Sequence, residues 1–335
     1  MRRFVARVAT FLLLQSIVVT FVIAYGVPGH GNNYLAAFDD KVRRLEQCRG
    51  PRLVVLGGSN VAFGFNSPLM EQSLGMETVN LGLHVMLGLS FPMDCYLQHA
   101  RRGDIVILCP EYHLLTSPQH QQGDPKLVNR LIEQCPRAKR YLPGATQSSW
   151  KQFFDHDALW IAHQWVGRAF RNARDRNEDE KIYGRRGFNQ FGDMIAHHDR
   201  VADEWVPLDP VPESTPECLQ QSIDALNRFE QECRNRGVTV YFSYPPLEET
   251  TFADSQQVIE NLHRAIEKHV EIPLLHSPEA FALDRKCFYD TGYHLNEESG
   301  KQRTRRLAEA IRQRQQDRPA AALASRYERI FNIEF

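Results

Sequence analysis

Residues 53–60 read Leu-Val-Val-Leu-Gly-Gly-Ser-Asn, and this stretch decides the fold. Its four apolar residues form a short continuous run, which is typical of a strand buried on both faces of a parallel sheet. The run stops at two glycines, and a serine follows at once. We therefore expect a strand that ends in a sharp turn, with Ser59 at the carboxyl edge of the sheet, where open α/β folds bind ligands.

Further strands and helices alternate along the chain around this segment. Apolar runs predict strands over residues 76–81, 104–109, 238–244 and 272–276. Helical spacing of apolar residues predicts helices over 34–47, 89–100, 215–236, 254–269 and 297–314. This alternation predicts an α/β fold, a three-layer α/β/α sandwich with a parallel, flavodoxin-like sheet.

Between residues 117 and 214 the alternation stops, over a stretch too long for a plain connection in a compact domain. Helical patterns over 125–134 and 149–172 precede a charged stretch there, so we expect an inserted, mostly helical cap. The α/β domain is then made of residues 31–116 and 215–316, and residues 317–335 form a tail.

The amino terminus has the pattern of a membrane anchor. Residues 8–27 contain no charged side chain and follow three arginines. About 20 such residues cross a bilayer core, and the arginines favour a cytoplasmic amino end. We expect an uncleaved signal anchor within residues 1–30. A cleaved signal peptide is the alternative, and either one places the globular part outside the cytoplasm, in a periplasmic or extracellular position.

Composition narrows the choice of partners. The chain has 335 residues, 42% of them hydrophobic, which is enough to bury one sizeable core. Its formal net charge of -1 gives no reason to expect a nucleic acid as partner. The seven cysteines show neither a Cys-x-x-Cys pair nor zinc-ligand spacing. We therefore expect neither a metal nor another cofactor.

A second motif, Asp-Thr-Gly-Tyr-His at residues 290–294, supplies a carboxylate and an imidazole four residues apart. On a helical turn this spacing puts both side chains on one face. A serine hydroxyl becomes a nucleophile when an imidazole takes its proton and a carboxylate orients the imidazole. Ser59, His294 and Asp290 are therefore candidates for nucleophile, base and orienting acid. The alternative for Ser59 is a plain turn residue or helix N-cap.

Together these motifs resemble the SGNH (GDSL-like) hydrolases, and within them the membrane-anchored members that handle acyl esters of cell-envelope polymers. Residues 57–60 resemble the first block of the family and residues 80–82, Asn-Leu-Gly, the second. Residues 290–294 resemble the last, Asp-x-x-His, with one residue more. The resemblance implies that Ser59 is the nucleophile and that the backbone N–H groups of Ser59 and Gly82 bind the oxyanion.

The third block departs from the family. Residues 110–113 read Pro-Glu-Tyr-His, where the family has Gly-x-Asn-Asp and its Asn donates to the oxyanion. Losing one such donor costs about a hundredfold to a thousandfold in rate. Glu111 is either a second acid or a capping carboxylate. Residues 186–193 combine glycines, aromatic rings and polar side chains, a composition that favours sugar binding. The candidate substrate-binding residues are Asn60, Glu111, Tyr112, Asn189 and Asp193.

The resemblance implies ester chemistry through an acyl-serine intermediate. If water accepts the acyl group the protein is an esterase, and if a sugar hydroxyl accepts it the protein is an O-acyltransferase. With the anchor and the cap, it implies an envelope or exported polysaccharide as partner, with a membrane acyltransferase as one source of the acyl donor. The alternative is a catalytically silent protein of the same fold that binds a polysaccharide or acts as a scaffold in an export complex, which the missing Asn favours.

Overall fold

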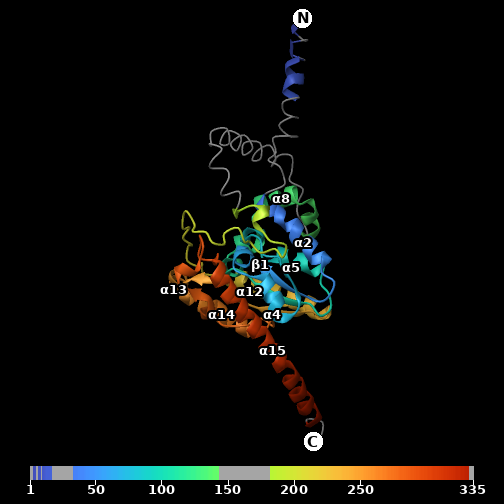
Figure 1. The fold of residues 1–335 in the computed structure, drawn as a ribbon, viewed down its shortest axis with the longest axis vertical. Helices are drawn as coiled ribbons and strands as arrows, with labels where there is room; N and C mark the ends of the chain where they lie inside the picture. The colour runs from blue at the N-terminus through green and yellow to red at the C-terminus, as the bar shows by residue number, and fades with distance from the viewer. Residues whose placement is uncertain (1–2, 5–6, 9, 17–32, 143–181, 332–335) are drawn as a thin grey trace.

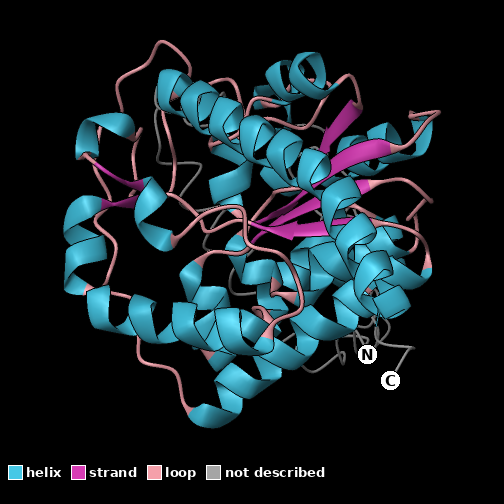
Figure 2. Ribbon diagram, turned by 90° about the horizontal axis from the view of Figure 1, so that it is seen from below, coloured by secondary structure: helices cyan, strands magenta, loops and turns pink. Residues whose placement is uncertain are grey.

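The computed structural model describes residues 3–4, 7–8, 10–16, 33–142 and 182–331, with side chains described up to residue 316 in the last range. Figure 1 draws these residues in colour. A parallel sheet lies at the centre and helices surround it (Figure 2). Its strands, in the order β2-β1-β3-β4, are β1 (Arg52–Gly57), β2 (Glu77–Asn80), β3 (Ile105–Cys109) and β4 (Thr239–Phe242). The predicted α/β fold with a parallel sheet is confirmed.

The pairing of the strands brings their carboxyl ends together. β1 lies between β2 and β3, with Val55 opposite Asn80 and Gly57 opposite Cys109. All residues of β1 and β3 are buried, as their continuous apolar runs predict. The segments that follow β1, β2 and β3 therefore meet at one edge of the sheet.

One face of the sheet packs against several helices. Val54 and Leu56 point into a buried cluster with residues of α5 (Ser90–Leu97), α12 (Pro216–Asn235) and α14 (Gln256–His269). Each of these helices begins or ends within a few residues of its predicted bounds. Side chains alternate in direction along a strand, so every second residue of β1 belongs to this face.

The opposite face has a cluster of its own. Leu53 and Val55 pack there with Met70 of α4 (Ser67–Leu74) and Ile311 of α15 (Glu297–Phe331). The last part of α15 extends away from the body towards the carboxyl terminus (Figure 1). Helices thus cover both faces of the sheet, which shields its apolar side chains from water.

Shorter elements complete the described chain. They are η1 (Tyr34–Ala36), α2 (Ala37–Gln47), α3 (Ser59–Phe63), η2 (Val85–Leu87), α6 (Tyr112–Thr116), α7 (Pro118–Gln122), α8 (Pro125–Gln134), η3 (Pro136–Tyr141), η5 (Arg185–Gly187), β5 (Leu247–Glu248), α13 (Glu249–Asp254), η6 (Pro278–Phe281), β6 (Ala282–Leu283) and η7 (Arg285–Cys287). β5 and β6 pair with each other in a separate small sheet.

The strand predicted over residues 272–276 is wrong. In the structure this segment makes a single bridge, with Leu274 opposite Phe242 at the end of β4. Phe242 donates to the carbonyl of Pro273, and Leu275 donates back to Phe242, both at 2.9 Å. Pro273 has no N–H to contribute, so a longer ladder does not form through it.

Two predicted segments fall on residues that are not described. The helix predicted over 149–172 lies outside them, whereas the helix predicted over 125–134 is present as α8. The anchor predicted at residues 8–27 lies mostly outside them as well. Within the described ranges, no helix is both long enough and apolar enough to span a bilayer.

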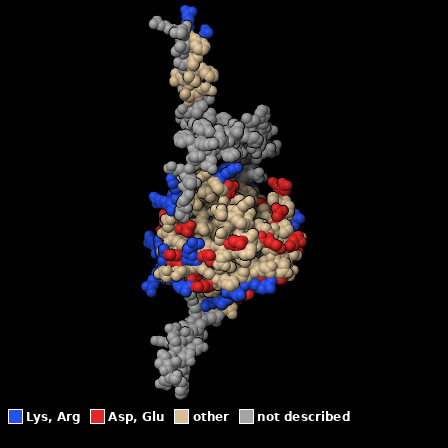
Figure 3. Space-filling model, turned by 180° about the vertical axis from the view of Figure 1, so that it is seen from behind, with Lys and Arg blue, Asp and Glu red and all other residues tan. Residues whose placement is uncertain are grey.

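Charges on the described surface are mixed. Lys and Arg side chains are interspersed with Asp and Glu over the face in Figure 3. Inside, one ion pair is fully buried: Arg52, at the start of β1, donates to Asp104, just before β3, at 2.6 Å, and neither side chain is exposed. The Tyr96 hydroxyl donates to the same carboxylate at 3.0 Å. This pair fixes the amino ends of the two central strands.

Removing the acid of this pair should strongly destabilise the protein. Asp104→Ala leaves the Arg52 guanidinium buried without its partner, which costs about 3–5 kcal/mol of unfolding free energy. The control is Glu232→Ala, which breaks an exposed pair with Arg236 and should cost less than about 1 kcal/mol. Urea unfolding measures both, and equal effects in the two variants would contradict the role given to Asp104.

Candidate functional site

The turn after β1 places Ser59 at the start of α3. A side chain at Gly57 would lie 2.4 Å from the carbonyl oxygen of Cys109, and one at Gly58 would lie 2.5 Å from Glu111 Oε1. A side chain at either of these glycines would require a neighbour to shift. In the structure they make room for the end of β3 and for Glu111, so the close approach is between two segments of the protein.

Glu111 is the direct partner of Ser59. Its Oε1 accepts hydrogen bonds from Ser59 Oγ at 3.2 Å and from the Asn60 N–H at 3.1 Å. The side chain is almost fully buried. Burial raises the pKa of Glu111 above its ordinary value, against the opposing effects of the Asn60 N–H and the charge of His294. A carboxyl group with a raised pKa therefore contacts the candidate nucleophile.

Asp290 and His294 form a second buried pair. His294 Nδ1 lies 2.8 Å from Asp290 Oδ1, and the Tyr183 hydroxyl donates to the other oxygen of Asp290. The ring of Phe63 stacks on the imidazole, with centroids 4.0 Å apart. Burial opposes the ionisation of Asp290, but the hydrogen bond and charge of His294 hold the pKa of Asp290 below its ordinary value. The imidazole is thus oriented with Nε2 left for proton transfer.

These two side chains meet across a turn, not on a helix as predicted. The Tyr289 N–H donates to the His294 carbonyl at 2.7 Å, and the His294 N–H donates to Thr291 at 3.2 Å. Backbone hydrogen bonds within residues 289–294 close the loop before α15 begins. The spacing of four residues therefore brings the side chains together through turn geometry.

The predicted contact between Ser59 and His294 is not present in the structure. Both residues are described, and the Ser59 hydroxyl donates to Glu111 instead. His294 is close enough for its charge to lower the pKa of Glu111. Phe63, in the helix that Ser59 begins, also stacks on His294, so the three side chains lie in one region, and the serine has Glu111 as its hydrogen-bond partner.

One of the two predicted oxyanion donors already has an acceptor. The Gly82 N–H donates to the side-chain oxygen of Asn80 at 2.9 Å, and the Ser59 N–H lies close enough to Glu111 to oppose the rise in its pKa. A side chain at Gly82 would lie 2.8 Å from both the Ala62 nitrogen and the Gly58 oxygen, so packing alone requires glycine there. An oxyanion at this position would compete with the acceptor in place.

Two of the candidate substrate-binding residues are enclosed in the core. Asn60 is fully buried and donates to the Cys109 carbonyl at 3.2 Å, while its oxygen accepts from Gly58. Tyr112 is fully buried and its ring stacks near that of Tyr244. These side chains stabilise the turn and the core, and a substrate cannot reach them.

Asp193 also has a structural position. It is buried, and it accepts from the Ser67 hydroxyl at 2.6 Å, from Asn80 at 2.9 Å and from Asn189 at 3.1 Å. Asn189 in turn accepts from the Phe191 N–H within the loop. Asp193 thereby fastens the loop to the end of β2, and Asn189 is the more accessible of the two.

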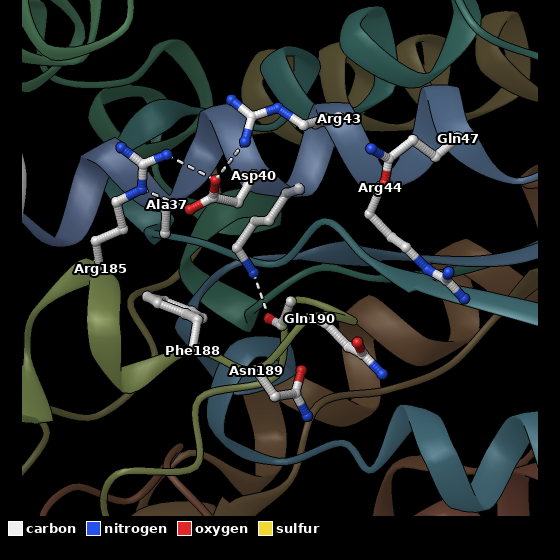
Figure 4. Close-up of a pocket in the computed structure, with 11 residues that line it drawn as sticks. Ala37, Asp40, Arg43, Arg44, Gln47, Arg185, Phe188, Asn189 and Gln190 are labelled. Atoms are coloured by element: carbon white, nitrogen blue, oxygen red, sulfur yellow. Dashed lines mark hydrogen bonds and ion pairs between the residues drawn. The ribbon is translucent and has the colours of Figure 1, made fainter.

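A pocket of about 380 Å³ lies between α2 and this loop, at the β2 edge of the sheet (Figure 4). The guanidinium groups of Arg43 and Arg185 converge there on Asp40. Lys41 points to the loop and donates to the Gly192 carbonyl at 2.5 Å. Burial lowers the pKa of this lysine to about 7. The loop that we singled out thus lines a pocket, but Ser59 and His294 do not.

Sequence reasoning missed three aromatic side chains around His294. Phe63 stacks on it, Tyr183 binds its partner Asp290, and Tyr34 lies next to Tyr183 with ring centroids 6.2 Å apart. Phe63 comes one helical turn after Ser59, a spacing that could have suggested it. Nothing in the sequence near Tyr183 marks it as a neighbour of the motif at residues 290–294.

The described residues form neither a disulfide bond nor a group of side chains that could bind a metal ion. All seven cysteines are free, and six of them are buried. In the described ranges no three His, Cys, Asp or Glu side chains gather in a way that could hold a metal ion.

In comparisons with known proteins, no family model matches the chain, and no curated protein matches it significantly. The geometry of the site is therefore the basis of the functional proposal.

The close fit at Gly57 should be visible in stability. Gly57→Ala puts a methyl group against a backbone oxygen that cannot move freely, and overpacking of this kind costs about 1–3 kcal/mol. Gly50→Ala is the matched control, since a side chain there meets nothing within 4 Å. Urea unfolding of both variants measures the difference, and a Gly57→Ala protein as stable as Gly50→Ala would contradict this packing.

The buried Glu111 should make stability depend on pH. Because its pKa is raised in the folded protein, the folded state binds this proton more tightly, so stability falls as pH rises from the ordinary value of 4.5 to the folded pKa. Glu111→Gln removes this loss. We expect the variant to be more stable than the wild type at neutral pH, with the difference shrinking as pH falls from the folded pKa towards 4.5. Unfolding curves at several pH values test this, and a variant destabilised at neutral pH would contradict it.

Proposed function

We propose that the protein is a serine-dependent ester hydrolase or O-acyltransferase that works through an acyl-Ser59 intermediate. The observation that supports it most is the buried pair of His294 and Asp290, in a structure that also places a serine at the carboxyl edge of the sheet. An imidazole held by a carboxylate is the usual means of moving protons in acyl transfer. The resemblance to SGNH hydrolases in residues 57–60, 80–82 and 290–294 points the same way.

In the proposed mechanism, His294 transfers the protons of the two half-reactions through Nε2. Asp290 accepts from Nδ1 and so fixes the tautomer, and Tyr183 holds the second oxygen of Asp290. The backbone N–H groups of Ser59 and Gly82 are the proposed oxyanion donors once the present acceptor of Gly82 gives way. Phe63 keeps the imidazole plane in place by stacking.

The proposed substrate is an acyl ester, acetyl-like in size, on an envelope or exported polysaccharide. It follows from the proposed extracytoplasmic position, with residues 8–27 as a membrane anchor, residues 117–214 as an inserted cap on a three-layer, flavodoxin-like sandwich, and a membrane acyltransferase as one source of the acyl group. Phe188, Asn189 and Gln190 line a pocket with an aromatic ring and two amides, which suits a sugar.

A second candidate function comes from another class. The Gly82 N–H donates to Asn80, and residues 110–113 lack the Asn that donates to the oxyanion in the SGNH family. Both features favour a catalytically silent protein that uses the same fold to hold a polysaccharide or to act as a scaffold in an export complex. Reactivity of Ser59 separates the two functions.

A serine-directed fluorophosphonate probe should label the wild type and fail to label Ser59→Ala. The hydroxyl of an unactivated serine does not react with such a probe, so labelling reports activation by the site. Ser90→Ala is the control, since Ser90 is an exposed serine that also begins a helix. Labelling that survives in Ser59→Ala, or a wild type that stays unlabelled, counts against the enzyme and for the silent protein.

Envelope glycans from cells with and without the protein should differ by an acyl mass. A hydrolase leaves more ester groups when it is absent, and a transferase leaves fewer, so the sign of the change gives the direction of the reaction. Complementation with Ser59→Ala should behave like the absence of the protein. Identical glycan masses in all strains would remove the polysaccharide from the proposal.

A further inference from the structure

The hydroxyl proton of Ser59 points to a carboxylate. A general base must lie within hydrogen-bond reach of the proton it removes, about 2.6–3.2 Å between heavy atoms. Glu111 Oε1 lies 3.2 Å from Ser59 Oγ and meets this condition, whereas His294 has no hydrogen bond to Ser59 in the described structure. The group placed to receive the proton is therefore Glu111.

Glu111 is held in this place from several sides. It follows β3 directly, its Oε1 also accepts from the Asn60 N–H, and Gly58 leaves the space that its carboxyl group occupies. The bond from the Asn60 N–H also lets Glu111 cap α3, but burial opposes the charged form of a cap. Burial does make a carboxylate a stronger base, which is what an activated serine needs.

We propose that Glu111 is a catalytic residue that takes the proton of Ser59, and that the His294–Asp290 pair serves the leaving group and the acyl acceptor. This inference rests on the proposed function. In this mechanism two side chains share the proton transfers that the sequence motif assigned to His294 alone.

In the first half-reaction Ser59 loses a proton to Glu111 and the leaving group gains one from His294. Ser59 Oγ attacks the acyl carbon as its proton passes to Glu111 Oε1, and the carbonyl electron pair moves onto the carbonyl oxygen. That pair then returns, the bond to the leaving oxygen breaks, and this oxygen takes a proton from Nε2 of the His294 imidazolium. The acyl-serine then stands beside a neutral Glu111 and a neutral His294.

The second half-reaction restores the starting state. Water or a sugar hydroxyl attacks the acyl carbon while its proton passes to His294 Nε2. The bond from the acyl carbon to Ser59 Oγ breaks, and the oxygen takes back the proton held by Glu111. Glu111 and His294 thereby return to the protonation states in which the first half-reaction began.

Other titratable groups also face Glu111. Its charge acts on Tyr34 of η1 and on Tyr293, next to His294. Burial, with the negative charge of Glu111, raises the pKa of both phenols, so they stay neutral through the range in which Glu111 ionises. Asp290 ionises below its ordinary value of 3.8, and burial lowers the pKa of His84, which lies near His294. A rise in the labelling rate of His294→Gln above pH 4.5 that persists when His84→Gln is added therefore reports Glu111.

The rate of fluorophosphonate labelling tests the assignment. The probe isolates the first step, because the Oγ–P bond forms, the P–F bond breaks, and fluoride leaves with the bonding pair without needing a proton from His294. Glu111→Gln keeps the size and the acceptor oxygen but not the base, and should slow labelling at least about a hundredfold. His294→Gln should slow it less than about tenfold, and Glu232→Gln, at an exposed glutamate, is the matched control.

Two results would overturn the inference alone: labelling of Glu111→Gln within tenfold of the wild type, or His294→Gln slowed as much as Glu111→Gln. If Glu111→Gln does not fold, the pH profile of His294→Gln decides. Its labelling should rise with pH through one ionisation above 4.5, and a flat profile would overturn the inference. A wild type that does not label at all overturns the proposed function itself, and the inference with it.

Discussion

The register between β1 and β3 is the constraint on which the site depends. It places Gly57 opposite Cys109. Ser59 lies two residues after the end of β1, and Glu111 lies two residues after the end of β3. The paired strand ends therefore bring a hydroxyl and a carboxyl group together, although 52 residues separate them in the chain. A slip of one position would turn the strand's side chains to the opposite faces of the sheet and separate the pair.

The sequence predicts the fold correctly at the strands whose burial produces a continuous apolar run. β1 and β3 are buried on both faces, so their apolar runs at 53–56 and 104–109 were clear. The segment 272–276 is apolar as well, but Pro273 removes the N–H that a full strand would need, and pairing stops at one bridge. An apolar composition indicates that a segment is buried, but it does not show that the segment pairs with a neighbouring strand.

The candidate site was predictable only where its parts are local. The spacing of Asp290 and His294 predicted their pairing, although a turn and not a helix produces it. The contact of Ser59 with Glu111 spans 52 residues and follows from strand register, which a sequence pattern does not state. Tyr183 reaches Asp290 across 107 residues, and no local signal announces such a contact.

These separations also set an order of assembly. Ser59 and Glu111 lie in the first third of the chain, and their strands can pair while the rest is still being made. The imidazole and its carboxylate come more than 170 residues later, as the numbering of Glu111 and Asp290 shows. Contacts of high sequence separation form slowly, since a long loop must close before they repay its entropy. A nascent or truncated chain can therefore pair Ser59 with Glu111, but it lacks the imidazole that serves the leaving group and the acyl acceptor until the last part of the domain has docked.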